Sequence, residues 1–107
     1  MHFTYIIRCK DGSLYTGYTN NILRRMKEHE SGINSKYTRN KGFEKLEVYF
    51  ISDTRSKAMK LESFIKKQSR NKKLNIIKNP QDFINEIENG FNYIVGEINN
   101  ISIKNIQ

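Results

Sequence analysis

The 107-residue sequence predicts a fold of mixed strands and helices, arranged in the order ββαβα between residues 3 and 70. Three observations support this order. Two segments rich in β-forming residues flank a turn at Asp11-Gly12, two segments with helical spacing of apolar residues each follow a capping residue, and a short apolar run separates these helices. Two adjacent strands at the start of the chain predict a β-hairpin.

The hairpin strands are predicted at residues 3–9 and 13–18, and the turn between them can form in two ways. A two-residue turn uses only Asp11 and Gly12. A three-residue loop adds Lys10 and places Gly12 in the left-handed region beside a bulge. The choice between them decides which side chains share a face, because side chains alternate along a strand.

Tyr5 and Tyr15 lie on the same face only with the three-residue loop, which pairs Tyr5 with Gly17 and Ile7 with Tyr15. With the two-residue turn they lie on opposite faces. We expect the first register, in which Gly17 opposite Tyr5 would leave space over the sheet for a phosphate. The alternative interpretation is that two strand tyrosines pack with their hydroxyls at the rim of the sheet.

The first helix is predicted to begin after Asn20 or Asn21, which can cap it, and to run to about Glu30, before Gly32. Arg25 and His29 stand one turn apart at the border of its apolar stripe, so they are expected to lean together over the face that carries the tyrosines. The stripe itself is formed by Ile22, Leu23 and Met26.

The polar stretch 31–45 is predicted as a loop whose cations, Lys36 and Arg39 among them, face either an anion or water. The apolar run 46–52 has strand length. A second helix is predicted to follow a cap at Asp53 or Thr54 and to extend to about Arg70, with its apolar stripe at Ala58, Leu61, Phe64, Ile65 and Gln68.

Glu62 is the single carboxylate on this second helix, just outside the apolar stripe. One interpretation is an exposed ion pair with Lys66 four residues later, which stabilises a helix by only about 0.3 to 0.5 kcal/mol. The other is a Mg²⁺ ligand, because Mg²⁺ takes one or two carboxylates together with phosphate oxygens and keeps several waters. The basic run 66–73 is interpreted as partly solvated and partly in contact with phosphate, through Lys66, Lys67 and Arg70.

The segment after residue 80 is treated as a C-terminal extension, residues 81–107, of a domain spanning residues 1–80. A break of the helix is expected at residues 71–73, followed by an apolar turn at 74–77. Pro80 is a favourable first residue for a helix that ends near Gly90, and a final strand is expected around Ile101 and Ile103. The extension either packs on the core through Phe83, Ile84 and Ile87 or lies over the basic surface and competes with phosphate.

The two parts of the chain, residues 1–80 and 81–107, differ in net charge. Residues 1–80 hold 18 Lys and Arg against 7 Asp and Glu, a net +11, whereas residues 81–107 hold 1 against 4, a net −3. A basic body suits a polyanion such as nucleic acid, whose phosphates supply most non-specific affinity. Cys9 is the single cysteine of the sequence, and we expect it to be a buried strand residue of a protein in a reducing compartment. No apolar run approaches the length of a membrane span. We therefore expect a cytoplasmic protein without membrane contact.

The segment from Tyr5 to Gly17, Tyr-Ile-Ile-Arg-Cys-Lys-Asp-Gly-Ser-Leu-Tyr-Thr-Gly, resembles the GIY-YIG nuclease family, and in particular its small stand-alone bacterial members. The resemblance covers roughly residues 1–78. Phe3 stands where the family has its named glycine, and Thr4 and Thr16 replace its isoleucines. The residues that match are Tyr5 of the first motif, Tyr15 and Gly17 of the second, the helix residues Arg25 and His29, and the metal-binding Glu62.

The resemblance implies an α+β architecture, with a three-stranded antiparallel sheet flanked by helices. It also implies a metal-dependent endonuclease that hydrolyses DNA phosphodiester bonds, in DNA repair or recombination, with one Mg²⁺ or Mn²⁺ held by Glu62. Tyr5 would act as general base or orient the water, assisted by His29 and by a neighbouring cation that lowers the pKa of the phenol. Arg25 would stabilise developing charge, and Tyr15 would position phosphate or water.

Two other classes of function remain open at this point. The chain could be a catalytically silent nucleic-acid-binding module, with contacts from Gly17, Lys36, Arg39, Lys66, Lys67 and Arg70. It could also be a protein-interaction domain that presents a basic face to an acidic partner.

Overall fold

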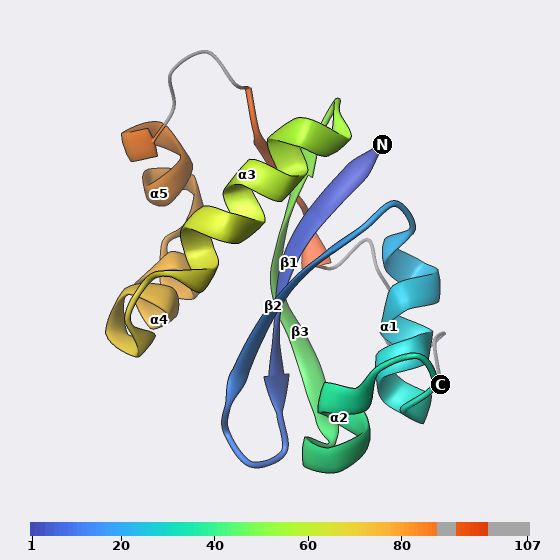
Figure 1. The fold of residues 1–107 in the computed structure, drawn as a ribbon. Coiled ribbons are helices and arrows are strands. Elements are labelled where there is room, and N and C mark those ends of the chain that lie inside the picture. Colours follow the sequence, from blue (N-terminus) through green and yellow to red (C-terminus); the bar gives the residue numbers. More distant parts are fainter. Residues whose placement is uncertain (88–91, 99–107) are drawn as a thin grey trace.

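A computed structural model describes residues 1–87 and 92–98 of the chain (Figure 1). Its architecture is α+β, as expected, with a four-stranded antiparallel sheet in the order β2-β1-β3-β4. The elements are β1 (His2–Cys9), β2 (Leu14–Thr19), α1 (Ile22–Ser31), α2 (Lys36–Lys41), β3 (Phe43–Ser52), α3 (Arg55–Lys66), α4 (Arg70–Lys78), α5 (Pro80–Ile87) and β4 (Ile94–Val95). The sheet therefore has one short strand more than the three expected.

Helices cover both faces of the sheet (Figure 1). On one face α1 packs its buried Ile22 and Met26 against a cluster that includes Tyr5 and Cys9. On the other face α3, α4 and α5 pack against Ile6, Val48 and Phe50 through Leu61, Ile65, Ile76, Phe83 and Ile84. Strand β1 lies between β2 and β3 and contributes alternate residues to both clusters, as the period of two requires.

The first helix matches its prediction closely. The side chain of Asn21 caps α1 by accepting a hydrogen bond from the Arg24 amide at 3.0 Å, and the helix ends at Gly32, which has the left-handed φ of 77° that a glycine adopts without strain. Leu23 is the exception to the predicted stripe. It is 49% exposed, because the buried stripe is narrower than the three apolar residues suggested.

The polar stretch predicted as a loop contains the short helix α2. Thr38 is the buried residue of this helix, so the segment carries no apolar periodicity from which a helix could be predicted. Gly42 follows α2 with a φ of 76° and leads the chain into β3, which begins three residues earlier than expected, at Phe43. The prediction of an irregular loop over 31–45 is therefore wrong.

The segment predicted as the second helix, together with the residues that follow it, forms two helices in the structure. Thr54 caps α3, as expected, but α3 ends at Lys66 rather than near Arg70. Ser69 then caps α4 by accepting a hydrogen bond from the Lys72 amide at 3.1 Å, so the expected break at residues 71–73 is wrong. The buried Ile76 fixes α4 to the core, which the basic sequence around it does not reveal.

The segment after residue 80 begins with α5 at Pro80, as predicted, and buries Phe83 and Ile84 against α3 and the sheet. Glu86 of this helix lies 3.5 Å from Lys72 of α4. Strand β4 follows and pairs with β3. The expected helix end near Gly90 and the strand around Ile101 and Ile103 lie outside the described residues. None of the described helices has the length and apolar character needed to cross a membrane.

Candidate active site

The hairpin loop fixes the positions of the two candidate tyrosines. The amide of Gly12, at a φ of 87°, donates to the carbonyl of Cys9 at 2.9 Å, which closes the three-residue loop that was expected. The resulting register pairs Tyr5 with Gly17 and Ile7 with Tyr15. The two tyrosine rings share a face, with centroids 6.4 Å apart, so the predicted register is confirmed.

The space above Gly17 is occupied by the side chain of Tyr5. A Cβ atom built at this position would lie 2.5 Å from the Tyr5 hydroxyl and 2.6 Å from the ring carbon that bears it. The phenol of Tyr5 therefore crosses directly above the glycine of the neighbouring strand. The expectation that this glycine leaves space for a phosphate is wrong in this structure, because the tyrosine of the paired strand occupies that space.

Helix α1 brings Arg25 and His29 onto the Tyr5 hydroxyl from one side of the sheet. Tyr5 Oη lies 2.7 Å from His29 Nε2, and Arg25 Nε donates to the same oxygen at 3.2 Å. The two helix residues are four apart, so they project from one face of α1, and the apolar contacts of Met26 hold that face on the sheet. The side chains of Arg25 and His29, predicted from helical spacing, thus both contact the hydroxyl oxygen of Tyr5, which was predicted from the hairpin register.

The electrostatics of this cluster are dominated by burial. Burial raises the pKa of Tyr5, and the hydrogen bond and charge of Arg25 lower it by less, so the phenol is a weaker acid than in water. The expectation that a neighbouring cation lowers this pKa overall is wrong for the free protein. Burial, followed by the charge of Arg25, lowers the pKa of His29 to about 4, which keeps its imidazole neutral at pH 7.

Arg25 is anchored at both ends of its guanidinium group. While Nε contacts Tyr5, Nη1 donates to Glu28 Oε1 at 3.0 Å and to the carbonyl of Asn34 at 3.0 Å. Glu28 was not among the predicted site residues, but its spacing of three residues allows it to reach Arg25 on the helix surface. The Arg25 side chain remains 19% exposed, so an anion can approach it from solvent.

The unpredicted helix α2 closes the site on the side of His29. Ser35 Oγ, at its N-terminus, lies 2.9 Å from His29 Nδ1, and Thr38 Oγ1 lies 3.2 Å from the same atom. Tyr37 packs its ring 4.9 Å from that of Tyr15. These residues were missed because they stand in a polar segment, and their role depends on contacts that only the folded chain creates.

Glu62 lies on α3, in the layer on the other face of the sheet from α1. Among the hydrogen bonds and ion pairs of the described residues its partner is Lys66, so it is not joined to the cluster around Tyr5. Its charge lies close enough to Tyr5 to raise the pKa of that phenol, although this effect is smaller than that of burial. Lys66 contacts Glu62 at 3.5 Å, and the Glu62 side chain is 15% exposed. Among the described residues, no three His, Cys, Asp or Glu side chains are grouped as a metal cage. One accessible carboxylate nevertheless fits a Mg²⁺ ion that takes its remaining ligands from phosphate and water.

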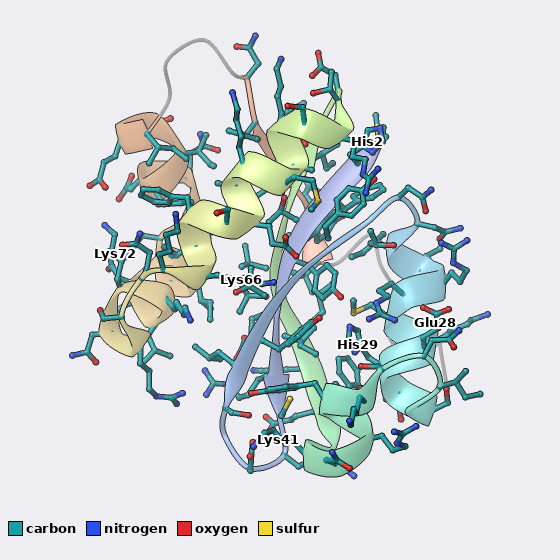
Figure 2. The ribbon with its side chains drawn as sticks, viewed as in Figure 1. His2, Glu28, His29, Lys41, Lys66 and Lys72 are labelled. Atoms are coloured by element: carbon teal, nitrogen blue, oxygen red, sulfur yellow. The ribbon has the colours of Figure 1, made fainter. Side chains whose placement is uncertain are left out.

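The five cations expected to contact nucleic acid lie on two sides of this cluster. Lys36 and Arg39 are exposed on α2, beside the His29 end of the site. Lys66 and Lys67 at the end of α3, and Arg70 at the start of α4, are exposed in the other layer. Figure 2 shows Lys66 and His29 on opposite sides of strand β2.

Comparisons with known proteins cover this same part of the chain. The family described as the GIY-YIG catalytic domain matches residues 1–75, a range that contains all five candidate catalytic residues. A UPF0213 protein of Fusobacterium nucleatum is 47% identical over 88 residues, which is 82% of this chain and 88% of the relative. One of Clostridium perfringens is 46% identical over 72% of this chain and 83% of the relative. The solution NMR structure of a UPF0213 protein from Bacillus halodurans is 44% identical, covers 72% of this chain and 82% of that one, and has a TM-score of 0.48.

Proposed function

The chain belongs to the GIY-YIG catalytic domain family, a nuclease-like family, and from this premise we propose that it is a divalent-metal-dependent endonuclease that hydrolyses DNA phosphodiester bonds. The observation that carries the proposal is the convergence of Arg25 Nε and His29 Nε2 on the Tyr5 hydroxyl, at 3.2 and 2.7 Å. A phenol held between a cation and a neutral imidazole is suited to moving a proton next to a phosphate. Exposed lysines and arginines on both sides of the cluster suit the phosphates of nucleic acid.

Each residue has a role that its environment supports. Arg25, partly exposed and fixed by Glu28, would stabilise negative charge that develops on the phosphate. Tyr5 would accept a proton from the attacking water while it passes its own proton to neutral His29. Tyr15, in ring contact with both residues, would position phosphate or water. Glu62 would hold Mg²⁺ or Mn²⁺, which when bound stabilises the charge on the leaving oxygen.

A catalytically silent nucleic-acid-binding module is the second candidate, and two observations favour it. Tyr5 and His29 are 0% and 1% exposed, so substrate water reaches the phenol only if a covering side chain such as Arg25 moves. Lys66 contacts the carboxylate that the metal would require. A module of this kind would keep the basic surface and bind without cleavage.

The deciding experiment compares cleavage and binding in two charge-matched variants. We expect the wild-type chain to nick DNA with Mg²⁺ and to lose this activity with EDTA. Glu62→Gln should abolish cleavage and preserve binding, whereas Glu30→Gln, which changes an exposed carboxylate at the end of α1, should preserve both. Salt-sensitive binding without cleavage under any metal would establish the silent module.

A panel of single-stranded, duplex and branched DNA, with matched RNA, defines the substrate in the same assay. Preference for RNA would correct the proposed substrate. Absence of binding to every nucleic acid, together with retention of an acidic protein, would favour the protein-interaction domain and contradict both nucleic-acid proposals.

A further inference from the structure

Ser35 occupies the N-cap position of α2 but does not cap the helix. An N-cap serine ordinarily accepts a hydrogen bond from a backbone amide of the first turn, which stabilises the helix. The Ser35 hydroxyl instead lies 2.9 Å from His29 Nδ1, and the residue is 5% exposed. Its side chain is therefore used on the imidazole and not on the helix that it begins.

Thr38 completes the surroundings of the same nitrogen. Its hydroxyl lies 2.6 Å from Ser35 Oγ and 3.2 Å from His29 Nδ1, and the residue is 3% exposed. One hydroxyl stands at the N-cap of α2 and the other three residues later in the helix, and both are shielded from water. His29 Nδ1 thus faces two buried hydroxyls, while Nε2 of the same ring faces Tyr5.

Counting protons distinguishes two arrangements of this cluster. If His29 carries its proton on Nε2, the Tyr5 oxygen accepts from both His29 and Arg25, and its own proton has no acceptor among the described residues. Tyr5 is 0% exposed, so water does not supply one. A buried donor without a hydrogen-bond acceptor destabilises the folded state.

In the other arrangement His29 carries its proton on Nδ1, and every donor of the cluster has an acceptor. Tyr5 donates to His29 Nε2, and His29 Nδ1–H donates to Ser35 Oγ. In the structure Thr38 Oγ1 donates to Ser35 Oγ at 2.6 Å, and rotation of the two hydroxyls reverses this bond, so that Ser35 donates to Thr38 Oγ1. Thr38 then donates to the carbonyl of Ser35 at 3.5 Å, and Arg25 Nε–H donates to a lone pair of the Tyr5 oxygen. This arrangement is favoured because each buried donor has an acceptor.

We propose that Ser35 and Thr38 are positioning residues that hold His29 as the neutral Nδ1–H tautomer and so present the Nε2 lone pair to Tyr5. The catalytic meaning of this tautomer rests on the proposed nuclease function, whereas the tautomer itself does not. Tyr5 Oη can pass its proton to Nε2 as the same oxygen takes a proton from water, which leaves an imidazolium with both nitrogens protonated. Two hydroxyls here serve the orienting purpose that a carboxylate serves in a Ser-His-Asp triad, without supplying a charge.

The test is the ring tautomer of His29 in the full chain, measured by NMR on ¹⁵N-histidine-labelled protein at pH 7. We expect the wild type to show a protonated Nδ1 and an unprotonated Nε2. The variant Ser35→Ala/Thr38→Val should lose this pattern, whereas the conservative variants Ser35→Thr and Thr38→Ser should retain it. His29→Gln identifies the signals, since His2 is the other histidine of the sequence.

A wild-type protein with the proton on Nε2 would overturn the proposal, as would a double variant that keeps the wild-type pattern. If the double variant does not fold, Ser35→Ala compared with Ser35→Thr carries the same test. In cleavage assays the double variant should be slower by about tenfold or more at unchanged DNA affinity. A wild-type protein with the expected tautomer but no cleavage would contradict the nuclease function and leave the tautomer inference standing.

Discussion

The two faces of the sheet are packed by different chemistry. The face under α3, α4 and α5 buries Leu61, Ile65, Ile76, Phe83 and Ile84 against apolar strand residues. The face under α1 and α2 buries Tyr5 and His29, whose polar atoms are joined in one hydrogen-bonded cluster with Arg25. The comparison teaches that the first face supplies stability through burial, while the second keeps polar groups buried that are stable only with every partner in place.

The largest expected effect tests the apolar face. Phe83→Ala should lower the free energy of unfolding by about 3 to 5 kcal/mol, because it leaves a cavity beside Phe50, whose ring lies 5.8 Å away. Chemical denaturation measures the loss. Phe64→Ala, at a ring that is 42% exposed, is the matched control and should lose less. Equal losses would show that α5 contributes little to the core.

The second largest effect is expected from acid pH, which should lower the free energy of unfolding through the polar face. The pKa of His29 is lowered to about 4, whereas an unfolded histidine titrates near 6.5, so the unfolded state binds the proton more readily. The contribution of neutral His29 to the free energy of unfolding is therefore fully present above pH 6.5. It is lost as the pH decreases toward 4, and the total loss is about 3 kcal/mol. Denaturation across this range should give a flatter profile for His29→Gln. An identical profile in that variant would contradict the neutral buried imidazole.

The close approach of Tyr5 to Gly17 predicts a somewhat smaller effect. Gly17→Ala should destabilise the protein by about 1 to 3 kcal/mol, because the new methyl group and the buried phenol would occupy the same space. In a Tyr5→Leu background, which removes the ring, the same substitution should cost less. Additive losses in this double-mutant cycle would show that the phenol is not what the glycine accommodates.

The smallest effect concerns the outer surface of the α3 and α4 layer. Lys66→Glu/Lys67→Glu should reduce the slope of log affinity against log salt by about one unit for each phosphate that the variant no longer binds. Melting temperature should change little, because both side chains are exposed. Lys27→Glu, an exposed change on α1, serves as the control. Equal slopes in all variants would remove this surface from the nucleic-acid interface.

The sequence predicts the hairpin well, because its register follows from local rules. The glycine at position 12 permits the three-residue loop, and alternation then places Tyr5 and Tyr15 together. The positions of Arg25 and His29 follow from helical spacing in the same way. Convergence of these residues could therefore be predicted before any tertiary contact was known.

What the sequence does not predict depends on burial and tertiary contact. The helix at 36–41 has no apolar periodicity, so the hydroxyls of Ser35 and Thr38 could not be connected with His29. The pKa of Tyr5 rises because the folded chain encloses the phenol, and neighbouring charge alone predicted the opposite direction. Helix α4 was missed because its one buried residue, Ile76, is surrounded by basic and polar ones.

The central claim is that the Tyr5, Arg25 and His29 cluster acts on a phosphodiester transition state. The most direct measurement is the single-turnover cleavage rate of Arg25→Ala at saturating DNA and Mg²⁺, with the dissociation constant measured alongside. Arg24→Ala is the matched control, since Arg24 is the adjacent arginine, exposed and bonded to Asn20. The account predicts a rate about a hundredfold lower for Arg25→Ala at nearly unchanged affinity, and a wild-type rate for Arg24→Ala. Equal rates in the two variants, or a loss of affinity that matches the loss of rate, would contradict it.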